Sequence, residues 1–359
     1  MKTILITGGL GFIGSHVAIS FYNRGFRVVL VDNLSRPTPN LHNKDAETYN
    51  LNYLKTDYSD IEVIIEDVRD KNKINQIFEK YRPDVIVHAA GQTSAVGSLE
   101  TPDYDFDNNV IGVFNVLDAA RRICKTPIFL YLSSNKVYGS GTNSINLKEE
   151  QTRYSPLNSE FSGIDETLAI DQSSHTPYGV SKLCGDLYVQ EYGYLYNMHT
   201  VVFRMSCIYG PRQFGFIEQG WVSHLIIGAI HNKPVEIYGD GKQVRDILYI
   251  DDLVELMGIV ISQKENEQNQ NILKSTEVFN VGGSASHSVS LLEMLGYIEQ
   301  AIGKKMDVRI KDWRPADQKY FVCDISKISK KYNWQPKVSP KIGIKNTSAW
   351  LQEHKDLFY

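Results

Sequence analysis

Residues 7–14 read Thr-Gly-Gly-Leu-Gly-Phe-Ile-Gly. The stretch lies between an apolar run at 2–7 and a segment of helical periodicity at 12–23, and a second apolar run follows at 27–31. Strand, helix and strand in this order form a β-α-β unit. Glycines at such a turn let the backbone approach a pyrophosphate closely, and the helix start offers free N–H groups. The pattern therefore predicts a phosphate cradle in a Rossmann-type unit.

The glycines of this cradle can be read as Gly8, Gly11 and Gly14, or with Gly9 as the first of the three. Asp32 ends the second predicted strand, at about the 20-residue interval that the dinucleotide motif requires. A carboxylate there accepts hydrogen bonds from ribose hydroxyls and repels a 2′-phosphate. The spacing therefore favours NAD over NADP as the cofactor.

Two further residues near the predicted cofactor site leave alternatives open. Arg36 is close enough in sequence to Asp32 to keep NADP in consideration. Asp67 follows the third predicted strand and could accept a hydrogen bond from the adenine amino group. The alternative for Asp67 is a helix N-cap for residues 71–81 or a turn residue. The sequence does not decide between these roles.

Apolar runs and helical stretches alternate along the first half of the chain, at 61–65, 71–81, 85–89, 109–124 and 128–132. This alternation predicts an α/β fold with a Rossmann-type, doubly wound parallel sheet. Residues 140–176 are polar and are expected to form a long loop with little regular structure. A helix is expected at 178–196 and a sixth strand at 199–203.

The alternation weakens beyond about residue 205. We therefore expect residues 1–204 to form a cofactor-binding domain, with 236–262 returning to it. Residues 205–235 and 263–359 are expected to form a smaller C-terminal substrate-binding domain. The length of 359 residues is enough for both.

The composition is that of an ordinary globular protein, with 42% apolar and 22% charged residues and a net charge of -4. No run of Lys and Arg is dense enough for nucleic acid, and no apolar run is long enough to span a membrane. The four cysteines are far apart, which argues against a metal site or a disulfide framework. We expect a soluble cytoplasmic protein with no nucleic-acid, membrane or metal partner.

Tyr178 and Lys182 are four residues apart and lie on one face of the predicted helix. A free tyrosine has a pKa of about 10. A nearby ammonium, together with the positive ring of an oxidised nicotinamide, favours the phenolate and would lower that pKa. The pair is therefore a candidate general acid and base. Ser134 follows a strand that ends at the predicted cofactor crevice, where its hydroxyl could share a hydrogen bond with a reacting oxygen.

The chain resembles the extended short-chain dehydrogenase/reductase family over nearly its whole length. The resemblance rests on TGGLGFIG, HAAGQ, Asn109, SSNKVYG, YGVSK, RDILYIDDL and FNVGG. Members of that family modify nucleotide-linked sugars with a tightly held NAD(H). The resemblance implies that Ser134, Tyr178 and Lys182 form the catalytic triad. It implies NAD contacts from Gly8, Gly11, Phe12, Ile13, Gly14, Asp32, Asn33, Asp67, Val68, Ala89, Ala90, Gly91, Asn109, Tyr178 and Lys182.

Longer stretches resemble one subgroup of that family, the CDP-paratose 2-epimerases, also called CDP-tyvelose epimerases. These are SNKVYG at 134–139, GPRQFGFIEQGWV at 210–222, GKQVRDIL at 241–248, and DQK at 317–319 ahead of FVCDI at 321–325. Members of this subgroup invert C2 of a CDP-sugar through a transient keto sugar. Inversion at C4 of a UDP-sugar is the wider family's commoner reaction and remains the alternative.

The residues after Ser134 bear on the type of reaction. The family's 4,6-dehydratases carry an Asp-Glu pair directly after the catalytic Thr, and its decarboxylases typically place a Glu in the same stretch. This chain has Asn135 and Lys136 there. The resemblance therefore favours epimerisation.

Arginine forks match phosphate oxygens, so Arg245 and Arg314 are candidates to hold the substrate diphosphate. Cys207 occupies a turn where many relatives carry Asn, which is a departure from the family pattern. The full set of expected substrate contacts is Gln92, Ser134, Asn135, Cys207, Gln213, Gln219, Trp221, Arg245 and Arg314.

Two expectations concern the whole molecule. The helices at 109–124 and 178–196 match those that form a four-helix interface in relatives, so a homodimer or homotetramer is expected. A protein of this fold can also be a non-catalytic NAD-binding sensor. The intact set of Ser134, Tyr178 and Lys182 argues against that class, because a sensor has no use for a base at this place.

Overall fold

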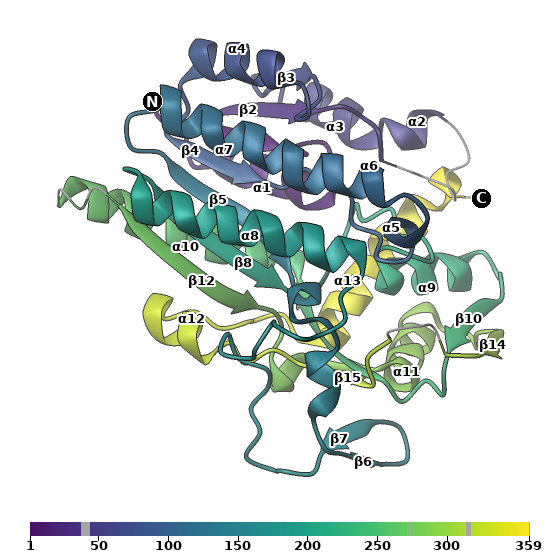
Figure 1. The fold of residues 1–359 in the computed structure, drawn as a ribbon. Helices are drawn as coiled ribbons and strands as arrows, with labels where there is room; N and C mark the ends of the chain where they lie inside the picture. Colours follow the sequence, from purple (N-terminus) through teal and green to yellow (C-terminus); the bar gives the residue numbers. More distant parts are fainter. Residues whose placement is uncertain (37–43, 271, 273, 314–316, 359) are drawn as a thin grey trace.

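A seven-stranded parallel sheet forms the centre of the molecule (Figure 1). The computed structural model describes residues 1–36, 44–270, 272, 274–313 and 317–358. Neighbouring strands are parallel throughout the sheet. In spatial order the strands are β3 (Glu62–Ile65), β2 (Arg27–Asp32), β1 (Thr3–Thr7), β4 (Val85–His88), β5 (Ile128–Ser134), β8 (His199–Met205) and β12 (Ser275–Val281). The strand order confirms the predicted Rossmann-type α/β fold.

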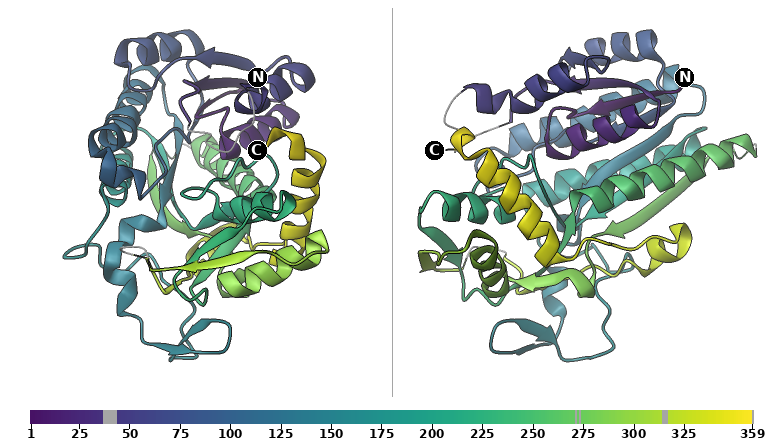
Figure 2. Two further views of the ribbon diagram at one scale, coloured as in Figure 1. Left: turned by 90° about the vertical axis from the view of Figure 1, so that its right-hand side faces the viewer. Right: turned by 180° about the vertical axis from the view of Figure 1, so that it is seen from behind.

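Helices cover both faces of the sheet, as Figure 1 and Figure 2 show. One face carries α4 (Lys71–Tyr81), α7 (Gly112–Ile123) and α8 (Pro177–Leu195), and the other carries α1 (Phe12–Asn23) and α10 (Ile250–Asn269). Successive strand residues point to opposite faces, so Ile4 and Ile6 enter one core while Leu5 enters the other. In the described ranges, no helix has the length and apolar character needed to cross a membrane.

The assignment of all of 263–359 to the second domain needs a correction. Ser275–Val281 forms β12, which pairs with β8 in parallel and is the seventh strand of the central sheet. The first half of this edge strand is only partly buried and carries Ser275, Thr276 and Glu277. These polar residues remove the continuous apolar run that marks the inner strands.

Only part of residues 236–262 returns to the first domain as expected. The helix α10 packs on α1, as expected for a return to the first domain. The strand β10 (Val235–Tyr238) instead pairs with β14 (Val308–Lys311). The strand β11 (Val244–Tyr249) joins β9 (Cys207–Tyr209), β13 (Ser288–Ser290) and β15 (Tyr320–Phe321). These small sheets, with α9 (Trp221–Ile230), α11 (Leu291–Ile302) and α13 (Pro340–Glu353), lie beyond the carboxyl ends of the central strands.

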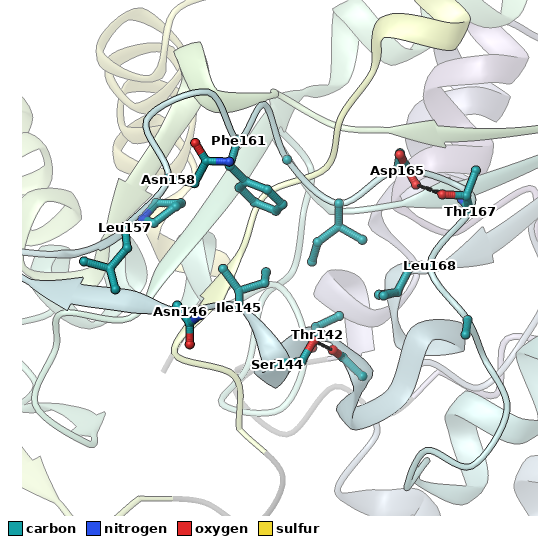
Figure 3. Close-up of a pocket in the computed structure, with 15 residues that line it drawn as sticks. Thr142, Ser144, Ile145, Asn146, Leu157, Asn158, Phe161, Asp165, Thr167 and Leu168 are labelled. Atoms are coloured by element: carbon teal, nitrogen blue, oxygen red, sulfur yellow. Dashed lines mark hydrogen bonds between the residues drawn. The ribbon is translucent and has the colours of Figure 1, made fainter.

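The segment 140–176 has more regular structure than expected. The 3-10 helix η2 (Asn135–Ser144) leads into a hairpin of β6 (Leu147–Glu149) and β7 (Tyr154–Pro156), which projects from the body of the molecule (Figure 1). A cavity of about 590 Å³ lies beside it, with Ile145, Leu157 and Phe161 in its wall (Figure 3). Ser134, Tyr178 and Lys182 do not line this cavity.

The remaining short elements are α2 (Lys44–Glu47), α3 (Tyr49–Asp57), α5 (Gly97–Glu100), α6 (Pro102–Phe106), η1 (Asp107–Ile111), η3 (Ala285–His287), α12 (Ser326–Tyr332) and η4 (Lys355–Leu357).

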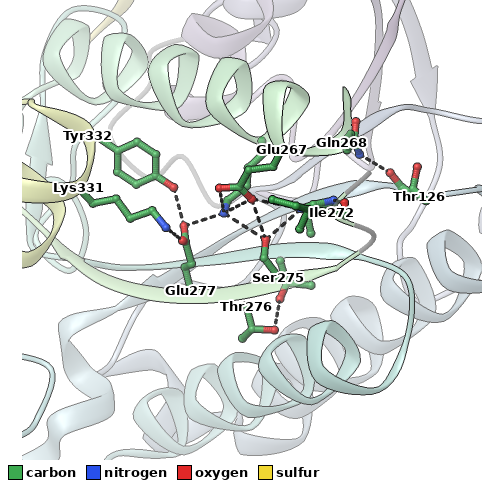
Figure 4. Close-up of polar contacts among 12 residues, drawn as sticks. Thr126, Glu267, Gln268, Ile272, Ser275, Thr276, Glu277, Lys331 and Tyr332 are labelled. Carbon is green, nitrogen blue, oxygen red and sulfur yellow. Dashed lines mark hydrogen bonds and ion pairs between the residues drawn. The ribbon is translucent and has the colours of Figure 1, made fainter. Parts of the chain in front are cut away.

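A buried ion network fastens β12 to the helices beside it (Figure 4). The Lys264 ammonium of α10 is fully buried and lies 2.9 Å from a carboxylate oxygen of Glu267 and 3.0 Å from one of Glu277. Lys331 and Tyr332 of α12 also bond to Glu277. A buried charge needs such partners, since leaving it unpaired costs several kcal/mol. The network therefore holds the edge strand in place.

Candidate functional site

The glycine turn after β1 is packed too closely to admit side chains. Gly8 has a φ of 65°, and a Cβ on it would lie 2.7 Å from the amide nitrogen of Ala90. A Cβ on Gly14 would overlap the carbonyl oxygen of Gly8. Gly11 stands at the N-cap of α1 and has no side chain to occupy the first amide groups of that helix. An uncapped helix start at a glycine cradle fits a pyrophosphate.

Asp32 lies at the end of β2, beside this turn. Its carboxylate accepts hydrogen bonds from the amides of Leu10 at 3.0 Å and Leu34 at 2.9 Å, which fix its orientation. Burial raises the pKa of Asp32. The nearby Arg36 donates to the carbonyl oxygen of Phe214 at 2.7 Å. Since Arg36 already has a backbone partner, the arrangement fits the two ribose hydroxyls of NAD.

Asp67 forms the turn that precedes α4. The Arg69 guanidinium, by its hydrogen bonds to the carboxylate, lowers the pKa of Asp67 to about 2, and Asn33 donates to the same group at 2.9 Å. The N-cap of α4 is Asp70, which accepts from two amides of the first turn. The N-cap alternative for Asp67 is therefore wrong, and the turn alternative is confirmed by the bond from the Arg69 amide at 2.8 Å. A contact with adenine stays a prediction.

The segment after β4 lies directly against the glycine turn. The amide of Ala89 donates to the Thr7 carbonyl at 3.1 Å, so Ala89, Ala90 and Gly91 line the same edge of the sheet. Asn109 is buried, and its side-chain amide nitrogen donates to the carbonyl oxygen of Gln92. The same nitrogen donates to the carboxylate of Asp105 in α6 and to the hydroxyl of Ser181 in α8. Asn109 thus ties this segment to α8.

The remaining expected cofactor residues cluster at the same place. Phe12 and Ile13 begin α1. Val68 packs closely against Gly112 of α7, because a Cβ on that glycine would lie 2.8 Å from a methyl group of Val68. Phe12 and Ile13 follow β1, and Val68 follows β3, two strands of the same half of the central sheet. Their direct contacts with a cofactor stay predictions.

The structure brings Ser134, Tyr178 and Lys182 together. Thr176 caps α8 and Pro177 occupies its first turn, so the helix begins just before Tyr178. All three side chains are buried, and a hydrogen bond with Ser134 lowers the pKa of the Tyr178 phenol. The Lys182 ammonium lies 4.4 Å from the centre of the Tyr131 ring. The candidate triad is therefore assembled by the end of β5 and the first turns of α8.

In the chain without cofactor the pKa of Tyr178 is raised, so the expected lowering stays a prediction for the site with oxidised NAD bound. Burial raises the pKa of Tyr178 to about 12, although the Ser134 hydrogen bond acts in the opposite direction. Burial also lowers the pKa of Lys182 to about 8, while the carboxylates of Asp186 and Asp105 oppose that change. Desolvation of both groups is the physical cause, and the spacing of the two residues in the sequence does not reveal it.

Three of the expected substrate residues meet at a small polar cluster. Arg245 on β11 bonds the carboxylate of Asp317 at 2.8 Å. Trp221 at the start of α9 donates its indole N–H to the sulfur of Cys207 at 3.4 Å. Burial raises the pKa of Cys207, and Arg245 is among the charges that act on it. Cys207, Trp221 and Arg245 therefore lie near one another.

Other expected substrate residues have different surroundings. Gln213 is buried and bonds the Ile208 carbonyl and the Ser223 hydroxyl, so both ends of its amide are occupied within the protein. Gln219 closes a tight turn with Phe216 through backbone bonds. Asn135 is buried and accepts from Ser134 at 3.4 Å. Gln92 donates to the Ser94 carbonyl. Arg314 lies outside the described residues.

One residue of the site was missed by the sequence reasoning. Lys136 follows Asn135, and Arg245, Asp317 and Cys207 are near enough for their charges to act on its half-buried side chain. The only sequence signal was its place two residues after Ser134, in the stretch SSNKVYG. In the sequence, a lysine at this position indicates only that no carboxylate is present there.

Known proteins are similar to this chain over nearly its whole length. The profile of the family described as GDP-mannose 4,6 dehydratase matches residues 5–347. A CDP-paratose 2-epimerase from Salmonella typhi is 36% identical over 352 residues, covering 97% of this chain and 98% of its own. A putative UDP-glucose 4-epimerase from Methanocaldococcus jannaschii is 30% identical over 351 residues, covering 98% and 99%.

The fold of the chain is also similar to solved structures over nearly its whole length. The UDP-glucuronic acid 4-epimerase of Bacillus cereus, in complex with UDP-glucuronic acid and NAD, has a TM-score of 0.78 at 27% identity, covering 98% of this chain and all of its own. The similarity confirms the fold and the family resemblance. The chain therefore belongs to the GDP-mannose 4,6-dehydratase family, the NAD-dependent epimerases and dehydratases of sugar nucleotides within the short-chain dehydrogenase/reductases.

Proposed function

We propose that this protein is an NAD-dependent isomerase that inverts C2 of a CDP-sugar, in the manner of CDP-paratose conversion to CDP-tyvelose. The observation that carries the proposal is the assembly of Ser134, Tyr178 and Lys182 at one sheet edge, beside a glycine cradle that fits NAD. The choice of C2 and of a cytidine nucleotide is supported by the full-length similarity to the Salmonella typhi 2-epimerase.

Tyr178, Ser134 and Lys182 each have a separate role in the transfer of the sugar's hydroxyl proton. NAD, when bound, supplies the hydride acceptor and donor. The phenol oxygen of Tyr178 takes the proton of the sugar hydroxyl, and the Ser134 hydroxyl orients that oxygen through the bond it shares with Tyr178. Lys182, whose ammonium is buried beneath the site, favours the phenolate. The resulting keto sugar is protonated again by Tyr178 when its other face is reduced, so the product is an epimer.

The residues after Ser134 favour epimerisation over elimination. Loss of water from a keto sugar needs an acid and a base beside the ring. Asn135 is neutral and Lys136 is a cation, so neither offers a carboxylate at this place. The family's profile is named for a dehydratase, and this pair is what separates the chain from that reaction.

A 4-epimerase is the second candidate. It is favoured by the full-length similarity to the Methanocaldococcus jannaschii protein and to the Bacillus cereus structure. The two reactions use the same triad and differ in which carbon faces it. A panel of CDP-, UDP- and GDP-sugars, followed by proton NMR, separates them by the ring proton whose couplings change. Lack of turnover on the whole panel would instead favour a non-catalytic NAD-binding sensor.

We also propose that α7 and α8 form a homodimer or homotetramer interface. The outer face of α8 exposes Val180, Leu187, Tyr188 and Leu195, which recur at helical spacing. The Tyr188 ring packs on Phe114 of α7, with ring centres 5.9 Å apart, so the two helices present one apolar surface. Contiguous apolar surface of this kind marks a site of association.

A further inference from the structure

A short segment between β9 and α9 links the second domain to the edge of the central sheet where the cofactor residues lie. It comprises residues 212–219 and is flanked by two glycines with positive φ, Gly210 at 155° and Gly220 at 72°. Residues 212–216 are buried although they lie outside the helices and strands. The segment is therefore packed against the rest of the protein, and glycines that tolerate unusual backbone angles stand at both of its ends.

The first half of the segment is bonded to the chain that follows β2. Arg36, four residues after Asp32, donates from Nη2 to the carbonyl oxygen of Phe214 at 2.7 Å. The Phe214 ring packs on Tyr49 of α3 and Trp350 of α13, with ring centres 5.7 and 6.0 Å away. These contacts fix Phe214 beside the residue expected to bind the ribose of NAD.

The second half of the segment is bonded to the chain that follows β4. Backbone hydrogen bonds of 2.8 and 3.0 Å between Phe216 and Gln219 form a tight turn with Glu218 at its tip. The Ser94 hydroxyl donates to the Glu218 carboxylate at 2.6 Å. Ser94 is itself held, because its hydroxyl accepts from the amide of Gly97 at 2.8 Å. The tip of the segment is therefore attached to a fixed partner.

The order of the strands places the glycine turn between these two attachments. The strand β1, which leads into the glycine turn, lies between β2 and β4 in the central sheet. Neighbouring strands are about 4.8 Å apart, so the ends of β2 and β4 are separated by about 10 Å. The chain from Phe214 to Glu218 is long enough to span that gap. A segment bonded on both sides therefore crosses in front of the glycine turn, where a pyrophosphate fits.

We propose that residues 212–219 form a strap that closes over bound NAD, with Glu218 as the positioning residue that fastens its tip to Ser94. The inference goes beyond the proposed function and rests only on NAD binding, whichever sugar carbon reacts. Epimerisation returns the cofactor to its starting state, so the reaction requires no exchange of cofactor. A strap attached on both sides of the glycine turn slows the release of NAD and keeps it in place between the two halves of a turnover.

The test measures how fast the holoenzyme releases NAD. The protein is loaded with radiolabelled NAD and mixed with excess unlabelled NAD, and the label that stays bound is followed over time. Ser94→Ala and Glu218→Ala each remove one partner of the same hydrogen bond, and each should speed release about three- to tenfold. Glu79→Ala, which removes an exposed acid of α4, is the matched control and should leave the rate unchanged.

Two further variants test whether the bond itself is responsible. Because Ser94→Ala and Glu218→Ala break one bond, the double variant should release NAD within about twofold of either single variant. Glu218→Gln keeps an acceptor for the Ser94 hydroxyl and should hold NAD longer than Glu218→Ala does. Melting curves in excess NAD should show each variant as stable as the wild type, since Glu218 is exposed.

Three results overturn the strap: release at the wild-type rate in both single variants, faster release in only one of them, or effects that multiply in the double variant. A wild type that neither carries nor binds NAD overturns the strap together with the cofactor. Failure to invert C2 of a CDP-sugar overturns the proposed function and leaves these release rates as the measure of the strap.

Discussion

Tyr178 is the residue on which the proposed chemistry depends most. Its phenol is buried, bonded to Ser134, and has a pKa raised to about 12 by that burial. An acid of this strength holds its proton firmly in the chain alone. Release of this proton during the reaction therefore requires the positive charges of the assembled site.

Tyr178→Phe removes only the hydroxyl. We expect kcat to fall by at least about 100-fold, because general acid and base catalysis contributes about 10² to 10⁴. The folding stability and the NAD content should stay near those of the wild type. Tyr194→Phe, on the exposed part of α8, is the matched control and should leave kcat unchanged. Turnover of Tyr178→Phe near the wild-type rate would remove Tyr178 from the mechanism.

At the residue scale, spacing was enough to predict which side chains come together. Tyr178 and Lys182 are four residues apart on a helix and Ser134 ends a strand, and the structure brings these residues together, while their catalytic roles stay predictions. Gln213 was expected to face substrate, but its amide is occupied by Ile208 and Ser223. Such partners come from segments that only the folded chain brings together.

At the scale of single elements, the inner strands were predictable and the edge strand was not. The inner strands are buried on both faces and read as apolar runs, while β12 is half exposed and begins with Ser275 and Thr276. The hairpin of β6 and β7 was also missed, because three-residue strands leave no periodicity to detect.

The contribution of the buried ion network to the stability of β12 can be tested at Lys264, whose ammonium is buried between Glu267 and Glu277. Lys264→Met leaves the partly buried Glu267 without this cation, which should lower the free energy of unfolding by about 3–5 kcal/mol. Lys337→Met removes the cation of the exposed pair with Glu255 and should cost about 1 kcal/mol or less. Urea denaturation measures both. Similar losses in the two variants would show that the network does not hold β12.

At the scale of the whole molecule, the apolar surface of α7 and α8 predicts self-association. Leu187 is 49% exposed at the middle of that surface. Leu187→Glu should shift the protein to a monomer in sedimentation experiments, because a buried, unpaired carboxylate opposes assembly. Lys345→Glu, an exposed charge change on α13, should leave the assembly intact. A wild type that sediments as a monomer would contradict the proposed interface.

The central claim is inversion at C2 with return of the same hydrogen. The most direct measurement is proton NMR of CDP-paratose with the protein and NAD in heavy water. We predict that the coupling between H1 and H2 changes from gluco to manno character while the signal of H2 keeps its full intensity. Unchanged couplings, or a change confined to H4, would contradict the assignment to C2. Loss of the H2 signal to deuterium would contradict the hydride route.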